Sequence, residues 1–273
     1  MQVQVLGCDF SSAPSLRKPI VMAWGYVANG VVRLDRLQTH SSLDDWAHSL
    51  HEPGPWVGGF DLPFGLPREL IEHLGWPTQW DECMDHYARL DRAEIRKTFA
   101  AFCDARPKGG KFAHRTTDAP AGSSPSMKWV NPPVAFMMHA GVPRLRAAGV
   151  HLPGLSAGDV QRVALEAYPG LLARELLGSQ SYKSDDKAKQ TPERLLARKH
   201  LLHELDMGKG RLALRLRLTA AQHDDLVADA SGDRLDAVLC MVQAAWALQQ
   251  HRSGHPRHGL PECDPLEGWI ITA

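Results

Sequence analysis

Residues 3–15 read VQVLGCDFSSAPS, an apolar run that passes directly into an aspartate. Polar and apolar residues alternate over residues 2–9, which predicts a half-buried β-strand that ends at Asp9. Residues 18–30 are rich in β-forming residues and end in an Asn-Gly turn signal, and another strand-like run, residues 31–39, follows at once. The chain is therefore predicted to open with a three-stranded meander.

Helix and strand patterns alternate after the meander. Residues 41–52 carry N-cap serines, early acids and apolar residues near a period of about 3.6, which is typical of a helix. Residues 55–61, PWVGGFD, then read as a buried strand that ends at Asp61. The remaining pattern is mainly helical, and its clearest elements are a short strand over residues 161–169 and helices over residues 191–205 and 232–250.

These elements predict a single α/β domain over residues 1–273, built on a mixed sheet of about five strands with helices on both faces. Residues from about 78 to 158 are expected to form a helical insertion. Within it, residues 106–132 are rich in Gly, Pro, Ser and basic residues and are too long for a plain connector. We expect this segment to be mobile without ligand.

Acidic residues end the predicted strands and begin the last helix. Asp9, Asp61 and Glu166 lie at strand ends, and Asp233 and Asp236 are three residues apart on one helix face. Four acids brought together at one sheet edge would repel one another and have raised pKa values unless a divalent cation neutralised them. The sequence therefore predicts a metal centre. Asp236 is the preferred helix ligand, because Asp233 also suits an N-cap or first-turn position.

The chemistry of such a centre follows from its ligands. Hard oxygen ligands suit Mg²⁺ or Mn²⁺. Two such ions about 3.5–4 Å apart can activate a water and stabilise the leaving oxygen in phosphodiester hydrolysis. The expected activity is therefore that of a divalent-metal-dependent nuclease, and the expected catalytic residues are Asp9, Asp61, Glu166 and Asp236.

Four short motifs resemble those of a known family. They are GCDFSSAP at residues 7–14, GFDLPFGLP at 59–67, EAYPG at 166–170 and DRLDA at 233–237. These motifs are similar to those of the proteins called domain of unknown function 429, which are described as predicted RNase H-like nucleases. The resemblance runs from Gly7 to about Ala244.

The resemblance implies an RNase H-like fold with the element order βββαβαβα. Carried over residue by residue, it makes Asp9, Asp61 and Asp236 metal ligands, with Glu166 or Asp233 as a further acid. It also implies that the substrate is nucleic acid, with DNA and RNA both open.

Contacts to that substrate are expected from two segments. Ser11 and Ser12 can hold a phosphate through their hydroxyl and backbone donors. Residues 106–132 form the most positive stretch of the chain, with only one acid, Asp118. The expected phosphate contacts of this segment are Arg106, Lys108, Lys111 and Arg115.

Composition narrows the possible classes of protein. The sequence is 44% hydrophobic and 23% charged, which excludes disordered and fibrous classes. Its 31 basic and 31 acidic side chains give no net charge, so any recognition of nucleic acid must be local. No signal peptide or membrane-spanning run is visible, and the five cysteines are scattered without a CxxC pair. We therefore expect a cytoplasmic protein with reduced, structural cysteines and no membrane partner.

Two alternative functions stay open. Actin-like ATPases and sugar kinases also begin βββαβ and place an acid and small hydroxyl residues at the first hairpin, so CDFSSA at residues 8–13 could hold ATP phosphates in a phosphotransferase. That fold needs a second meander, which the sequence lacks. The other alternative is a catalytically inactive RNase H-like binding module, against which the full set of acids speaks.

Overall fold

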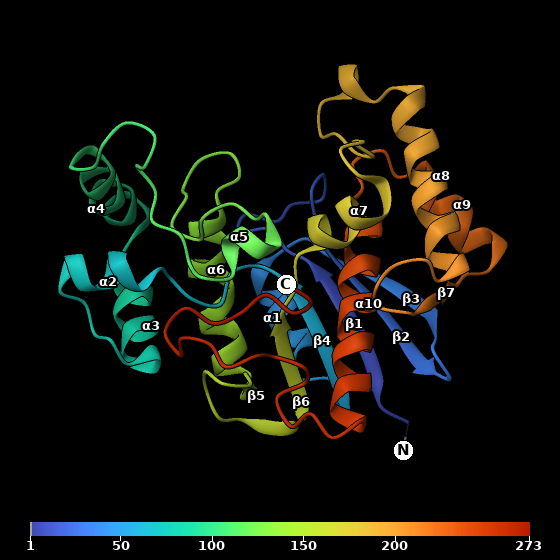
Figure 1. The fold of residues 1–273 in the computed structure, drawn as a ribbon, viewed down its shortest axis with the longest axis horizontal. Coiled ribbons are helices and arrows are strands. Elements are labelled where there is room, and N and C mark those ends of the chain that lie inside the picture. The colour runs from blue at the N-terminus through green and yellow to red at the C-terminus, as the bar shows by residue number, and fades with distance from the viewer. Residues whose placement is uncertain (1) are drawn as a thin grey trace.

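Seven strands form one mixed sheet in the computed structural model, which describes residues 2–273 (Figure 1). The strand order across the sheet is β5-β6-β4-β1-β2-β3-β7. The strands are β1 Gln4–Asp9, β2 Ile20–Ala28, β3 Val31–His40, β4 Trp56–Asp61, β5 Val150–His151, β6 Asp159–Glu166 and β7 Arg215–Arg217. Strands β1, β2 and β3 pair antiparallel, and β1, β4, β6 and β5 pair parallel in turn. The mixed α/β class is therefore confirmed.

The opening meander forms as expected. Asn29 and Gly30 join β2 to β3, and both have positive φ angles, 50° and 72°. Asn and Gly are the residues that adopt this left-handed conformation at least cost, which is why the dipeptide predicts a tight hairpin. The order βββαβ then continues through α1 to β4.

The expected number of strands is wrong. The two additional strands are β5 and β7, which lie at the opposite edges of the sheet. They contain two and three residues, and so short a run cannot show the alternation that predicts a strand. Their pairing with β6 and β3 is imposed by tertiary packing.

Ten α-helices surround the sheet in the described part of the chain. They are α1 Leu43–Ser49, α2 Arg68–Leu74, α3 Trp80–Arg89, α4 Arg92–Asp104, α5 Asp118–Ala121, α6 Val134–Ala147, α7 Pro169–Leu177, α8 Pro192–Met207, α9 Ala220–Ala228 and α10 Asp233–Arg252. Helices α1, α8 and α10 coincide with the three helices predicted by residue range. In Figure 1, α2 to α4 gather on one side of the molecule, and α8 and α9 on the other.

Two hydrophobic cores cover the two faces of the sheet, as the alternation of the strands requires. Leu6 and Cys8 of β1 belong to the first core, which includes Trp46 of α1 and Phe99 of α4. Val5 of β1 belongs to the second, which includes residues of α7 to α10. The prediction of helices on both faces is thus confirmed.

The expected insertion contains α3 to α6 and packs on the first core. Its basic segment, residues 106–132, is partly folded: it contains α5, and Ala113 and Met127 are buried in the core. Only part of this segment is therefore a surface loop. Among residues 2–273, no helix has the length and apolarity needed to cross a membrane.

Candidate metal centre

Three aspartates from three elements converge at the carboxyl ends of the central strands. Asp9 ends β1 and Asp61 ends β4, and the two residues are direct partners in the parallel register. Asp236 lies in the first turn of α10. One carboxylate oxygen from each residue lies within 4.8 Å of the others. The structure therefore brings together the three acids that the sequence predicts as metal ligands.

Two glycines allow α10 to bring Asp236 to this edge. Gly7 of β1 and Gly59 of β4 are paired, and both face the helix backbone. A Cβ atom at Gly7 would lie 2.0 Å from the Ala237 carbonyl oxygen, and one at Gly59 would lie 2.5 Å from that of Cys240. Real Cβ atoms do not make such contacts. Glycine at both positions is therefore required for the close approach of α10 to the sheet.

The carboxylates of the centre are electrostatically strained. Burial raises the pKa of Asp9 well above its ordinary value, and the nearby Asp236 raises it further. Burial and Asp236 also raise the pKa of Asp61, to about 7. Lys183 lowers both pKa values without cancelling these shifts. Oxygen donors in this state fit a hard divalent cation, which would stabilise their ionised forms.

Asp236 has two hydrogen-bond partners that the sequence does not predict. Its carboxylate is fully buried, and it accepts hydrogen bonds from the Tyr182 hydroxyl at Oδ1 and from the Lys183 ammonium at Oδ2. Lys183 is thus a cation built into the acidic centre. Tyr182 and Lys183 follow α7 in an irregular stretch, where no periodicity or motif indicates their role. In the sequence, the only indication of a nearby lysine is the uncompensated negative charge of the predicted acid cluster, which requires a cation close by.

A cleft of about 590 Å³ opens over the centre. Asp9, Asp61 and Asp233 line it together with Ser11 and Ser12. Asp233 lies outside the group of three converging aspartates, at the first position of α10. Burial raises its pKa, and Lys18 on the cleft wall lowers it. The structure thus places both predicted serines and the fourth predicted ligand beside the three aspartates.

The basic residues of this cleft are not those expected. Lys18 and Lys183 line it, and Lys18 forms an ion pair with Asp185, at 2.7 Å. None of Arg106, Lys108, Lys111 and Arg115 lines this cleft of the described chain. Lys108 and Lys111 are exposed, whereas Arg106 forms an ion pair with Glu69 and packs over the Phe102 ring.

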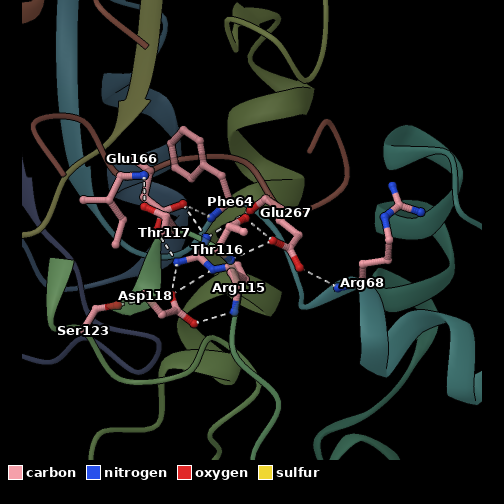
Figure 2. Close-up of polar contacts among 10 residues, drawn as sticks. Phe64, Arg68, Arg115, Thr116, Thr117, Asp118, Ser123, Glu166 and Glu267 are labelled. Atoms are coloured by element: carbon pink, nitrogen blue, oxygen red, sulfur yellow. Dashed lines mark hydrogen bonds and ion pairs between the residues drawn. The ribbon is translucent and has the colours of Figure 1, made fainter. Parts of the chain in front are cut away.

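Arg115 differs most from its expected place. It is 2% exposed, and its guanidinium spans two carboxylates (Figure 2). Nη2 lies 2.7 Å from Glu166 Oε1 and 3.0 Å from Asp118 Oδ1, and Nη1 donates to Glu166 Oε2 at 2.8 Å. The expectation that Arg115 contacts phosphate therefore has no geometric support, because buried protein acceptors, chiefly the two carboxylates, hold its guanidinium.

Glu166 is also held in this network and not with the three aspartates. Besides Arg115, its Oε2 accepts a hydrogen bond from the Phe64 backbone N–H at 2.9 Å. Both oxygens are thus engaged, and Glu166 is 4% exposed. Burial raises its pKa, and Arg115 opposes that shift. Glu166 ends β6 as predicted, but its side chain belongs to an ion pair beside the centre.

A third carboxylate, that of Glu267, ties the C-terminal segment to the same network. Glu267 Oε1 accepts from the Arg68 backbone N–H at 2.9 Å, and Oε2 accepts from the Thr116 backbone N–H and hydroxyl at 2.8 and 2.6 Å (Figure 2). Arg115 also donates to the Glu267 carbonyl at 3.1 Å. These contacts join the insertion and the C-terminal segment to β6 next to the centre.

The fold and the site define a mixed α/β protein with a half-buried carboxylate centre at the ends of its parallel strands. Comparison with known families gives a match to "Protein of unknown function (DUF429)" over residues 17–258, and the chain belongs to this family. The matched region includes Asp61, Glu166 and Asp236 and begins after Asp9. No curated protein and no solved structure matches the chain.

Proposed function

We propose that this protein is an RNase H-like nuclease that hydrolyses phosphodiester bonds with the help of Mg²⁺ or Mn²⁺. The observation that carries the proposal is the convergence of Asp9, Asp61 and Asp236 to within 4.8 Å, at the carboxyl ends of parallel strands. Ligand and active sites of α/β sheets lie at this edge. An acid from the first strand, one from the fourth and one from the last helix is also the arrangement that the resemblance implies.

The donor set fits the proposed ion. Asp9 and Asp61 would hold it, with Asp236 as the third carboxylate, and Asp233 is the nearest further acid of the cleft. A bound divalent ion would lower the pKa of a water and offset the negative charge that develops on a phosphodiester during hydrolysis.

The other residues of the cleft suit a phosphodiester. Ser11 and Ser12 lie in the loop that leaves β1, close after Asp9, and both half-buried residues line the cleft. Lys18 presents an ammonium group on the same wall. Hydrogen-bond donors and lysines that line the same cleft as the acids would orient a phosphate so that one of its bonds faces the carboxylates.

Cleavage assays with a matched pair of variants test the proposal. Single- and double-stranded DNA and RNA are incubated with the protein and millimolar Mg²⁺ or Mn²⁺. We expect at least one of them to be cut, with Asp9→Asn reducing the rate at least 100-fold. Asp224→Asn, which removes the same charge from a side chain that is 83% exposed on α9, should cut like the wild type.

Three outcomes would contradict the proposal in different ways. Cleavage that survives Asp9→Asn would locate the activity elsewhere. Tight binding of nucleic acid without cleavage would favour an inactive binding module. Hydrolysis of ATP without any cleavage of nucleic acid would favour the phosphotransferase, although the described chain has one meander and no second copy of it.

A further inference from the structure

Lys183 lies on the wall of the cleft, with its side chain 40% exposed and its ammonium group directed at the carboxylate centre. Its ammonium group forms an ion pair with Oδ2 of Asp236, a residue whose own side chain is fully buried. The adjacent Tyr182 hydroxyl donates to the other oxygen of the same carboxylate. Asp236 therefore already has one full positive charge and one neutral donor at its two oxygens.

The chain on both sides of Lys183 is held in place. The Tyr182 carbonyl accepts a hydrogen bond from the buried Arg198 at 2.8 Å, and the Ser184 N–H donates to the Ala230 carbonyl at 3.1 Å. The stem of Lys183 packs on Gly232, where an added Cβ atom would lie 2.7 Å from the Lys183 Cβ. The lysine is thus a fixed part of the site.

The charges of the centre then fix how many ions it can take. Asp9, Asp61 and Asp236 supply three negative charges, and Lys183 supplies one positive charge, so a single divalent ion makes the centre neutral. A second divalent ion would leave two uncompensated positive charges on this half-buried group of residues, next to an ammonium group that repels it. Farther along the cleft wall, Lys18 is already paired with Asp185, and Asp233 lies outside the group of three converging aspartates.

We propose that the Lys183 ammonium permanently holds one cation position of the centre, so that the protein binds one divalent ion where a two-ion site would bind a pair. The inference rests on the proposed function, because it assigns the ion of that same site. It makes Asp9 and Asp61 the main ligands of the single ion, with Asp236 shared between the ion and the lysine.

Counting bound ions tests the inference without nucleic acid. Titration of the full chain with Mn²⁺, read by calorimetry and by the loss of the free-ion spin-resonance signal, should saturate at one ion per chain. Lys183→Met keeps the aliphatic stem and removes the charge, and it should raise the count to two. Lys187→Met removes the same charge from an exposed lysine that does not line the cleft and should leave the count at one.

The outcomes separate this inference from the proposed function. Saturation of the wild type at two ions overturns the inference even if nucleic acid is cut. A count that stays at one in Lys183→Met, or no saturable binding by either protein, overturns it as well. One bound ion in the wild type and two in Lys183→Met support it, and an absence of cleavage would then refute only the nuclease. If Lys183→Met does not fold, Lys183→Gln, which also lacks the charge, replaces it, and the same two counts decide the question.

Discussion

Replacing Gly7 with alanine tests whether the contact between α10 and the sheet positions the centre. The new Cβ atom would lie 2.0 Å from the Ala237 carbonyl oxygen and 2.1 Å from the Met241 nitrogen. Both are backbone atoms in the middle of a helix, so no side-chain rotation can relieve the overlap. The helix must move away by more than about 1 Å to reach ordinary contact.

Two opposing effects set the magnitude. Overpacking of a core costs about 1–3 kcal/mol, and a clash with two backbone atoms belongs at the upper end of that range. Alanine recovers about 0.5–1 kcal/mol, because glycine loses more conformational entropy than alanine in a strand. The net loss in the free energy of unfolding should therefore be about 2 kcal/mol, a large part of the roughly 5–15 kcal/mol typical of a domain.

Urea denaturation of three variants measures this loss. Gly7→Ala should lower the midpoint without changing the slope of the transition. Gly59→Ala, with a closest contact of 2.5 Å, should cost less, and Gly110→Ala, which meets nothing within 4 Å, should stay within about 0.5 kcal/mol of wild type. The reasoning is refuted if Gly7→Ala is as stable as Gly110→Ala. It is also refuted if Gly7→Ala binds Mn²⁺ like the wild type, because Asp236 moves with α10.

Three further results follow from the charges of the site and of the surface. The pKa of Asp61 is raised to about 7 from about 3.9 in the unfolded chain, so the contribution of this carboxyl to the free energy of unfolding is present at pH 4 and is lost as the pH rises to 7. The melting temperature in EDTA should therefore fall across this range, and Asp61→Asn should flatten that fall. Millimolar Mg²⁺ or Mn²⁺ should raise the melting temperature of the wild type but not of Asp9→Asn, since an ion that binds only the native state stabilises it; an equal rise in both proteins would place the ion elsewhere. Arg115→Met should lower the free energy of unfolding by about 3–5 kcal/mol in chemical denaturation, because it leaves buried carboxylates unpaired. Neutralising the exposed Lys108 and Lys111 together should leave that free energy unchanged and should flatten the salt dependence of nucleic-acid binding.

Local patterns in the sequence predict most of the sheet and the three aspartates. Asp9 and Asp61 end strands whose apolar runs are easy to recognise, and parallel pairing places such ends side by side. Asp236 could be selected over Asp233 because it lies deeper in its helix. In each case the position depends on residues close in sequence.

What the sequence does not predict depends on distant partners. Glu166 has the same strand-end signal as the aspartates, but Arg115, 51 residues earlier, determines where its side chain points. Arg115 itself reads as a surface residue, because it lies in a polar, basic stretch. The lysine of the centre is 53 residues from Asp236 and belongs to no regular element. Contacts of this kind are set by packing and carry no periodic signal.

The ion pair between Glu166 and Arg115 also bears on how the chain length could vary among homologous proteins. The insertion follows β4, contains the edge strand β5 and ends before β6, so its loss would remove β5 and leave the pairing of β1 with β4 that holds Asp9 beside Asp61. Loss of the insertion would also remove Arg115 and leave the buried carboxylate of Glu166, at the end of β6, without its ion-pair partner. Homologues with a deletion in this region should therefore carry a neutral residue at the position of Glu166, and the two changes should have been inherited together.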